Sequence, residues 1–370
     1  YRLNIIKIHV APLRERREDI PLLIDHYIEE YAAMLGNSRI ERPSSRILDR
    51  LYAYNWPGNV RELQNVLKRM LVLGDGEQIV DELIDSMIEK GECEFVRDFA
   101  TPLPVYVIAD QLGVPRDDLR KIKAWSDAFA SRLGGLVTPE EEIENAKLIV
   151  EYQQYMVRVI EDRRATPRDD MISDLANTTI EDGRLMTLEE LLSMIQQLLV
   201  AGNETTTSAI TGGMLSLIQL SDQLQLLLDD PGMIDNAVEE ILRLETPSAG
   251  LWRVVTRDTE IRGVAIPKDS LLMLRYAAGN RDETVFTQPE AMDVCRANAD
   301  DHLAFGQGTH FCPGAMLARK EMQVAFRKLL QRLTRVQLAE GKNDLTHWPN
   351  VVLRGLKSLH ITYEPRQGAA

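Results

Sequence analysis

The segment that decides the fold is residues 305–315, which reads Phe-Gly-Gln-Gly-Thr-His-Phe-Cys-Pro-Gly-Ala. Its three glycines let the backbone bend tightly and approach a flat ligand closely. Cys312 stands just before a predicted helix that starts at Ala315, where backbone N–H groups and the helix dipole favour a thiolate. A thiolate in this position is a ligand for iron, and it pushes electron density toward an oxygen on the opposite side of the metal. The segment therefore predicts an iron site with Cys312 as a ligand.

Two other interpretations of this segment are weaker. A lone cysteine is usually a buried structural residue, but the full pattern Phe-Gly-x-Gly-x-x-x-Cys-x-Gly is too specific for that. A zinc site made of His302, His310 and Cys312 lacks a fourth ligand and a plausible spacing. The other cysteines, Cys93 and Cys295, bring the total to an odd three. Such a set does not make a disulfide framework, and it favours a reducing cytoplasm.

A second motif lies in the middle of the long predicted helix 187–220. Ala201 and Gly202 are small, so a flat cofactor can approach the helix and leave room for a diatomic molecule. Glu204 and Thr205 follow as an acid–alcohol pair, which can relay protons toward bound oxygen. Without this context, such a stretch would more often face solvent or bend the helix.

Two weaker motifs follow. Glu240 and Arg243 place opposite charges three residues apart on the predicted helix 233–244, a common arrangement. A short predicted strand, 252–256, then contains Arg253.

The four motifs, in this order, resemble the haem-binding segments of the cytochrome P-450 family of the soluble bacterial type, over residues 80–370. The resemblance implies that Cys312 is the axial ligand of a haem b iron and that Glu204 and Thr205 are the catalytic proton donors. Glu240 and Arg243 would form the structural ion pair of the family. The residues that the resemblance assigns to cofactor binding are Ala201, Gly202, Arg253, Phe305, Gly306, His310, Cys312 and Gly314, with Arg253 and His310 on the haem propionates.

The chemistry implied by the resemblance is insertion of one oxygen atom from O2 into a small apolar organic substrate. Two electrons would come from NAD(P)H through a ferredoxin reductase and a ferredoxin. Segment 288–292 departs from the family because it lacks the arginine that often completes the glutamate–arginine cluster, and Arg296 is a possible substitute. The sheet, helix and pocket-roofing loop that precede residue 80 in the family are absent, so we expect weakly held haem and reduced activity.

Residues 1–79 read as a separate unit of short helices. Segments 1–4, 12–16, 19–21 and 56–63 resemble the end of the AAA+ domain, the helical lid, of sigma-54-dependent transcriptional activators. There the resemblance implies nucleotide-sensing roles for Arg2 and Arg61. No Gly-x-x-x-x-Gly-Lys-Ser/Thr phosphate loop occurs in the 370 residues, so we expect both roles to be vestigial and ATP not to be used.

The sequence thus predicts a mainly α-helical protein with a small β component, built from a partial AAA+ lid, 1–79, and a partial haem-thiolate domain, 80–370. A glycine-rich acidic turn, 74–79, would join them. With 43 Lys and Arg against 57 Asp and Glu, the net charge is −14, which argues against nucleic-acid binding and against adsorption to an anionic membrane. The chain begins with Tyr1, which indicates a fragment. The alternatives to a monooxygenase are a fragment of a sigma-54-dependent regulator and an inactive chimeric or artefactual fusion.

Overall fold

The longest described helix, α9 (Leu188–Gln219), begins at a local sequence signal for a helix start. At its start, the Thr187 side chain accepts the N–H of Glu190, and the Glu190 carboxylate accepts the N–H of Thr187, a reciprocal capping box. This computed structural model describes residues 11–34, 48, 51–52, 54–56, 59–60, 63–64, 67, 74–134, 137–180 and 183–366. The chain divides into two compact units, Tyr1–Asp75 and Gly76–Ala370.

The first unit contains η1 (Leu13–Glu15) and α1 (Asp19–Met34). Its core consists of Leu13, Ile20, Ile24, Ile28, Trp56, Leu63 and Leu67. The Leu13 N–H donates to Asn59 Oδ1 at 2.9 Å, and the Trp56 indole N–H donates to the Leu51 carbonyl at 2.8 Å. The buried face of α1 is formed by Ile20, Ile24 and Ile28, four residues apart, and Leu22 on another face is 71% exposed. Arg2 and Arg61 lie outside the described residues.

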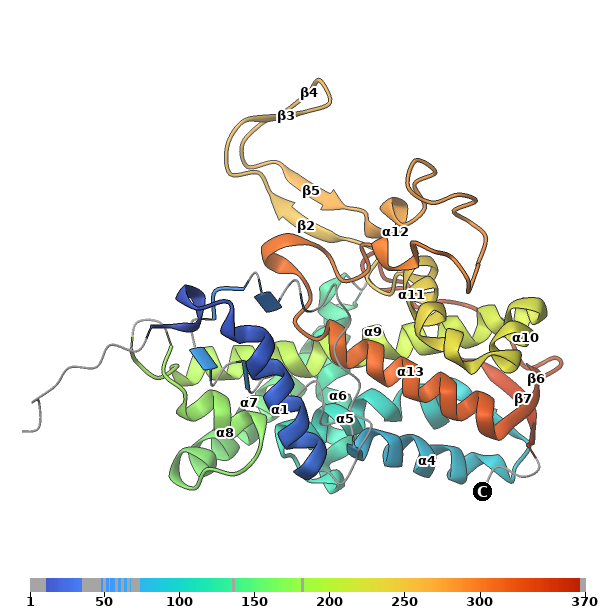
Figure 1. Cartoon of the computed structure of the whole chain (residues 1–370), viewed down its shortest axis with the longest axis horizontal. Coiled ribbons are helices and arrows are strands. Elements are labelled where there is room, and N and C mark those ends of the chain that lie inside the picture. The colour runs from blue at the N-terminus through green and yellow to red at the C-terminus, as the bar shows by residue number, and fades with distance from the viewer. Residues whose placement is uncertain are drawn as a thin grey trace, which may run out of the picture. The chain divides into compact units, whose positions relative to one another are not determined.

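The second unit is mainly helical, and α9 runs through its middle, where it packs against helices from both ends of the unit's sequence (Figure 1). The helices of this part are α4 (Gly74–Ile88), α5 (Pro102–Leu112), α6 (Leu119–Ala130), α7 (Pro139–Ala165), α8 (Met171–Asn177), α9, α10 (Ser221–Asp229), α11 (Ile234–Glu245), α12 (Tyr276–Gly279) and α13 (Ala315–Arg332). Short 3-10 or π turns are η2 (Val96–Ala100), η3 (Arg116–Asp118), η4 (Ser131–Leu133), η5 (Pro231–Met233), η6 (Ala299–Asp301) and η7 (Gly308–His310).

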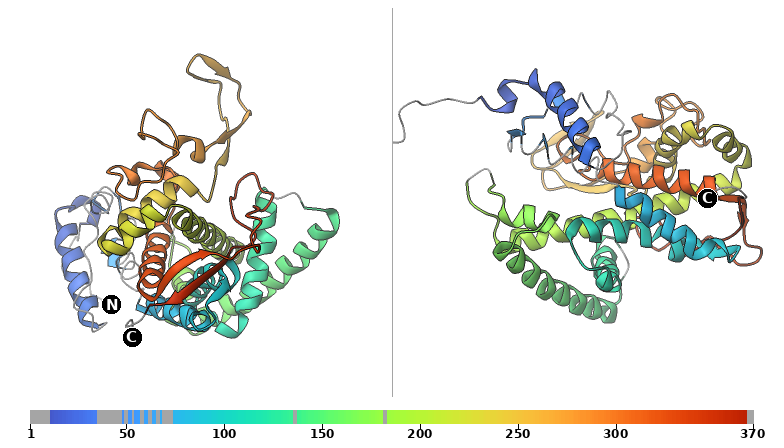
Figure 2. Two further views of the ribbon diagram at one scale, coloured as in Figure 1. Left: turned by 90° about the vertical axis from the view of Figure 1, so that its right-hand side faces the viewer. Right: turned by 60° about the horizontal axis from the view of Figure 1, so that its bottom comes forward.

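Three small antiparallel sheets complete this unit. The strands are β1 (Glu92–Glu94), β2 (Leu251–Val254), β3 (Thr259–Ile261), β4 (Val264–Ile266), β5 (Leu271–Leu274), β6 (Leu333–Leu338) and β7 (His360–Pro365). One sheet has the order β1-β7-β6, with Cys93 opposite Ile361. The β2–β5 pair and the β3–β4 hairpin project away from the helices (Figures 1 and 2). The predicted class, mainly helical with a small β component, is confirmed.

A large apolar core lies between α5, α6, α7, α8 and α9. Its fully buried members include Trp125, Tyr152, Met156, Ile195 and Leu199. The rings of Trp125 and Tyr152 meet edge to face at 5.9 Å, a favourable aromatic geometry. This core holds α6 against α9, and α11 and α13 pack on α9 as well.

One local prediction is wrong. Residues 74–79, predicted as a turn, form the first turns of α4, where Glu77 lies near the positive end of the helix dipole. Residues 95–112 are divided into η2 and α5, because Pro102 and Pro104 occupy the first turn of a new helix and interrupt the hydrogen bonds of the preceding turn.

Candidate functional site

The cysteine loop, defined here as residues 305–314, is a tight structure that leads into α13. Gly306 and Gly308 have φ values of +67° and +73°, a region that glycine adopts without strain. The Cys312 N–H donates to the Phe305 carbonyl at 2.9 Å, which closes the loop. Gly314 caps α13, and its N–H donates to the Cys312 sulfur. The loop therefore holds a half-buried sulfur at a helix N-terminus.

The pKa of the Cys312 thiol reflects opposing effects. Burial, the largest effect, raises this pKa, whereas the Gly314 N–H and the positive charge of Arg319 lower it. The net pKa lies above its ordinary value, so the sulfur is a thiol until a cation binds it.

The predicted ion pair between Glu240 and Arg243 forms as a bidentate contact at 2.7 and 2.8 Å, with both side chains fully buried. Arg296 is the third member of the cluster, since its Nε donates to both Glu240 oxygens at 3.1 and 3.0 Å. Arg243 also donates to the carbonyls of Asn280 and Pro289. Arg296 thus occupies the role of the arginine that segment 288–292 lacks. The cluster connects α11 with the segment before the cysteine loop.

The α9 segment, defined here as residues 201–205, is held more loosely. The Thr205 hydroxyl donates to the Ala201 carbonyl at 2.7 Å, the local bond that bends helices. Gly202 faces open space, because a Cβ built on it meets no atom within 4 Å. The Glu204 carboxylate accepts a hydrogen bond from Lys123 of α6 at 3.1 Å.

Lys123 also contacts Asp127, so one ammonium group lies between two carboxylates at the α6–α9 interface. Burial is the largest effect on the pKa of Asp127; Lys123 lowers this pKa and Glu204 raises it, and the result is about 6. The sequence pattern did not indicate Lys123, because it lies 81 residues from Glu204.

Arg253 and His310 have no ionic partner in the described part of the chain. Arg253 lies on β2, and its guanidinium donates only to the Trp252 carbonyl at 2.8 Å. His310 ends η7 and is exposed. A guanidinium and an imidazole without carboxylate partners are able to bind the carboxylates of a ligand.

These residues fit a haem group. The Cys312 sulfur is a ligand for iron, and Arg253 and His310 are free to bind the propionates. Gly202 leaves space open beside α9. No group of three or more His, Cys, Asp or Glu residues that could hold a bare metal ion occurs within the described ranges.

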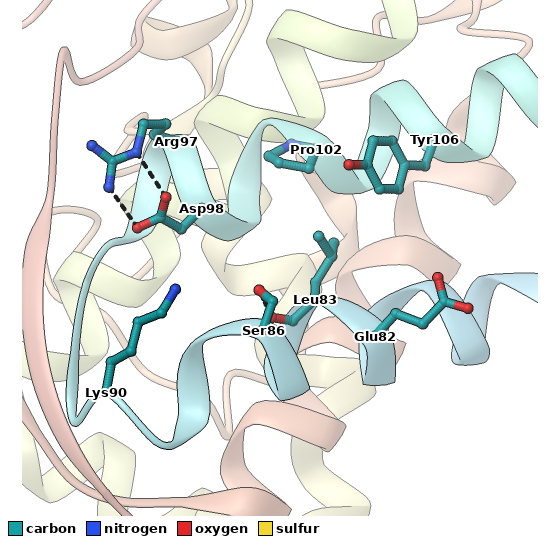
Figure 3. A pocket seen from close by; sticks show the side chains of 8 residues that line it. All are labelled: Glu82, Leu83, Ser86, Lys90, Arg97, Asp98, Pro102 and Tyr106. Carbon is teal, nitrogen blue, oxygen red and sulfur yellow. Dashed lines mark hydrogen bonds and ion pairs between the residues drawn. The ribbon is translucent and has the colours of Figure 1, made fainter. Parts of the chain in front are cut away.

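A separate cavity of about 390 Å³ lies between α4, η2 and α5 (Figure 3). Its lining residues are Glu82, Leu83, Ser86, Lys90, Arg97, Asp98, Pro102 and Tyr106. Arg97 forms two bonds with Asp98, at 2.7 and 2.8 Å, and Glu82 pairs with Arg116. None of these residues belongs to the cysteine loop or the α9 segment.

The sequence model of the family described as Cytochrome P-450 matches residues 136–225 and 229–361. A steroid C26-monooxygenase of Mycobacterium tuberculosis is 38% identical over 287 residues, which cover 78% of this chain and 77% of that protein. The chain belongs to the cytochrome P-450 family. This P-450 chain is also 36% identical over 290 residues to a vitamin D(3) 25-hydroxylase of Pseudonocardia autotrophica, covering 78% and 70% of the two chains.

Solved cytochromes P-450 share the fold. The cytochrome P-450 PksS of the Bacillus subtilis bacillaene polyketide synthase superposes with a TM-score of 0.74 at 33% identity, covering 85% of this chain and 81% of that one. The named relatives are monooxygenases, so the monooxygenase is favoured over the transcriptional regulator. Membership of the family implies a haem iron and electrons from a redox partner. No helix in the described ranges is long and apolar enough to cross a membrane.

The N-terminal part gives a second match. The sequence model of the AAA+ ATPase lid domain matches residues 14–95, a range that extends into α4 and beyond it. The predicted boundary at residue 79 stays a prediction.

Proposed function

We propose that this chain is a haem-thiolate monooxygenase that inserts one oxygen atom from O2 into a C–H bond of an apolar substrate of the steroid class. The observation that carries the proposal is the Cys312 sulfur, presented at the start of α13 by a closed loop and a backbone N–H donor. Two relatives are named for steroid or vitamin D oxidation, which supports the substrate class. When bound, haem b supplies the activation of O2 that amino-acid side chains cannot perform.

The residues of the chain would hold the cofactor in three ways. Cys312 would bind the iron as a thiolate, with the Gly314 N–H stabilising its charge. Arg253 and His310 would bind the propionates, because neither has an ionic partner in the described part of the chain. Ala201 and Gly202 would leave the space beside α9 that a flat ring requires. Phe305 and Gly306 would shape the loop on the sulfur side.

Glu204 and Thr205 are assigned to proton delivery. The Thr205 hydroxyl donates its hydrogen bond to the Ala201 carbonyl at 2.7 Å, and it must leave this bond before it donates to a ligand beside α9. The Glu204 carboxylate is held by Lys123, so it must exchange that contact for water before it carries a proton. The pair can therefore pass protons from the α6–α9 interface to the open side of α9.

Electrons would come from NAD(P)H through a ferredoxin reductase and a ferredoxin. The lid-like residues 1–79 form a separate domain in this proposal and contribute no ATP hydrolysis, because the 370 residues contain no phosphate loop. The 370-residue polypeptide is expected to show no magnesium-dependent ATP hydrolysis, and Arg61→Ala is expected to change nothing. Turnover of ATP that Arg61→Ala abolishes would contradict this assignment.

The direct test uses carbon monoxide. The reduced, haem-loaded chain should give the red-shifted Soret band of thiolate ligation, and Cys312→Ala should lose that band. Cys93→Ala and Cys295→Ala are matched controls and should keep it. With ferredoxin and its reductase, a steroid panel should then yield a hydroxylated product. A band that survives in Cys312→Ala would refute the proposed site.

A further inference from the structure

A buried carboxylate beside the cysteine loop joins three elements. Glu239 lies on α11, one residue before the ion-pair residue Glu240, and its side chain is 13% exposed. Arg319 of α13 donates to it through two nitrogens, at 2.6 Å to Oε1 and 2.9 Å to Oε2. His302, in the segment before the loop, contacts Oε2 through Nε2 at 3.0 Å. We call these three residues the Glu239 cluster.

The hydrogen bonds of the His302 ring define its tautomer. The Ala304 N–H donates to His302 Nδ1 at 3.1 Å, so Nδ1 carries no proton. The proton must then sit on Nε2, which donates to Glu239. The imidazole is neutral, and the cluster contains one negative charge, on Glu239, and one positive charge, on Arg319.

The charge on Glu239 persists over a wide pH range. Burial, the largest effect, raises the pKa of Glu239, but the hydrogen bonds from His302 and Arg319, together with the positive charge of Arg319, outweigh it and bring this pKa to about 2. The Arg319 guanidinium forms a bidentate contact with the Glu239 carboxylate, which is the strongest geometry for an arginine–carboxylate pair.

The cluster touches the loop through an aromatic ring. The Arg319 guanidinium carbon lies 4.6 Å from the centre of the Phe305 ring, and the His302 ring lies 5.7 Å from it. The Phe305 carbonyl accepts the N–H of Cys312 at 2.9 Å. Arg319 thus connects Glu239 with Phe305, whose carbonyl closes the ligand loop at Cys312.

We propose that Glu239 and Arg319 are positioning residues that fix Phe305, and with it Cys312, and that set the net charge felt by the sulfur. The proposal rests on the proposed role of Cys312 as iron ligand. Arg319 withdraws electron density from the sulfur, and Glu239 offsets part of this effect while it holds the guanidinium on the ring. Residues that contact a metal ligand, and not the metal itself, tune a redox potential in this way.

The two variants have opposite expected signs. Arg319→Gln removes a positive charge near the sulfur, so the reduction potential of the bound haem should fall. Glu239→Gln removes a negative charge and leaves Arg319, so the potential should rise. A purely structural role would move both potentials in the same direction. Arg319→Lys keeps the charge and loses the fork, so its potential should stay close to that of the unmodified chain.

A second readout needs no haem. In the haem-free protein, amide hydrogen exchange of the loop, residues 303–314, should become faster in Glu239→Gln and in Arg319→Lys, because both loosen Phe305. The matched control is Asp235→Asn, which breaks an ion pair between the same helices, Asp235 with Arg327 at 3.3 Å, that does not touch the loop. Asp235→Asn should change neither exchange nor potential.

Opposite shifts of the two potentials, with faster exchange in the loop, support the proposal. Shifts of the same sign, or loop exchange no faster than in Asp235→Asn, overturn it. If Glu239→Gln does not fold, the milder Glu239→Asp should show the same faster exchange. If the unmodified chain gives no thiolate-type carbon monoxide spectrum, the proposed function fails, and loop exchange in the haem-free variants still decides whether the cluster positions the loop.

Discussion

The cysteine loop and the α9 segment contribute the two halves of the candidate site, and they are held in different ways. The loop adjoins segments that long-range contacts hold. The Glu239 cluster contacts its Phe305 ring, and the buried cluster of Glu240, Arg243 and Arg296 fixes the chain ahead of it. The α9 segment is held mainly by bonds within its own helix, and its one ion pair, Glu204 with Lys123, is about 30% exposed on both sides.

The difference indicates a division of labour. A metal ligand needs a fixed geometry and a constant charge, which buried, fully bonded networks supply. A group that delivers protons must change partners, which a partly exposed ion pair permits because it contributes little free energy. The loop side should therefore respond strongly to the loss of one partner, and the α9 side should respond in function more than in stability.

The largest expected effect is on the loop side. Arg243→Met removes the bidentate partner of the fully buried Glu240. Removing one partner of a buried ion pair destabilises a protein by about 3–5 kcal/mol. Arg296 still bonds Glu240, but the carbonyls of Asn280 and Pro289 also lose their donor, so the free energy of unfolding should fall by up to that amount in urea titrations. Arg327→Met breaks an exposed ion pair of α13 and should cost less than about 1 kcal/mol. Equal losses in the two variants would show that burial of an ion pair does not decide how much free energy its loss costs.

The second effect depends on pH. Glu239 has a pKa of about 2 in the folded chain, below its ordinary value of 4.5. Its contribution to stability is therefore present above about pH 4.5 and is lost as the pH falls toward 2. The difference corresponds to about 3 kcal/mol at 1.36 kcal/mol per pKa unit. Thermal melts between pH 6 and pH 3 should show a smaller decrease for Glu239→Gln than for the unmodified chain, and parallel curves would contradict this.

Local patterns predicted part of this site. Three parts of the site are local patterns, each formed by residues that are close in the chain, so the sequence alone could indicate them. These are the loop glycines with Cys312, the pair Glu204 and Thr205, and the pair Glu240 and Arg243. The helical class followed from the same local periodicity.

Contacts across the fold could not be predicted in this way. Arg296 lies 56 residues from Glu240, and Arg319 lies 80 residues from Glu239. Only the packing of α11, α13 and the segment between them brings these charges together. A glutamate pair at 239–240 gives no local signal of which partner each carboxylate takes.

A third prediction concerns a destabilising group on the loop side. Glu321 of α13 is buried, and burial raises its pKa to about 8; it has no partner among the described residues. Because the unfolded chain ionises this carboxyl near pH 4.5, stability is lost as the pH rises from 4.5 toward 8. Glu321→Gln should avoid that loss, so its gain in the free energy of unfolding over the unmodified chain should grow as the pH rises from 4.5 to 8, with little change at pH 4.5. Equal effects at both pH values would show that Glu321 does not titrate in this range.

The smallest change in stability is expected on the α9 side. Lys123→Met removes the cation that holds Glu204, and this partly exposed pair should contribute less than about 1 kcal/mol. Proton delivery should respond more clearly, and kcat should change by about two- to tenfold. This effect is smaller than the roughly 10²–10⁴-fold contribution of a proton-transferring group, because Lys123 only holds Glu204 and does not transfer the proton itself. The solvent isotope effect on kcat measures this.

Lys121→Met is the control for this prediction. Lys121 lies on the same helix and pairs with Asp118 at 2.7 Å, away from α9. Its substitution should leave both stability and the isotope effect unchanged. A larger loss of stability in Lys123→Met than in Arg243→Met would reverse the comparison between the two regions.

The measurement that tests the account most directly is X-ray absorption at the iron K-edge of the haem-loaded 370-residue chain. The account predicts one sulfur atom bound to iron in the unmodified chain and in Cys93→Ala and Cys295→Ala, and no sulfur in Cys312→Ala. A sulfur ligand that remains in Cys312→Ala, or an iron without sulfur in the unmodified chain, would contradict the assignment of Cys312 on which the site is built.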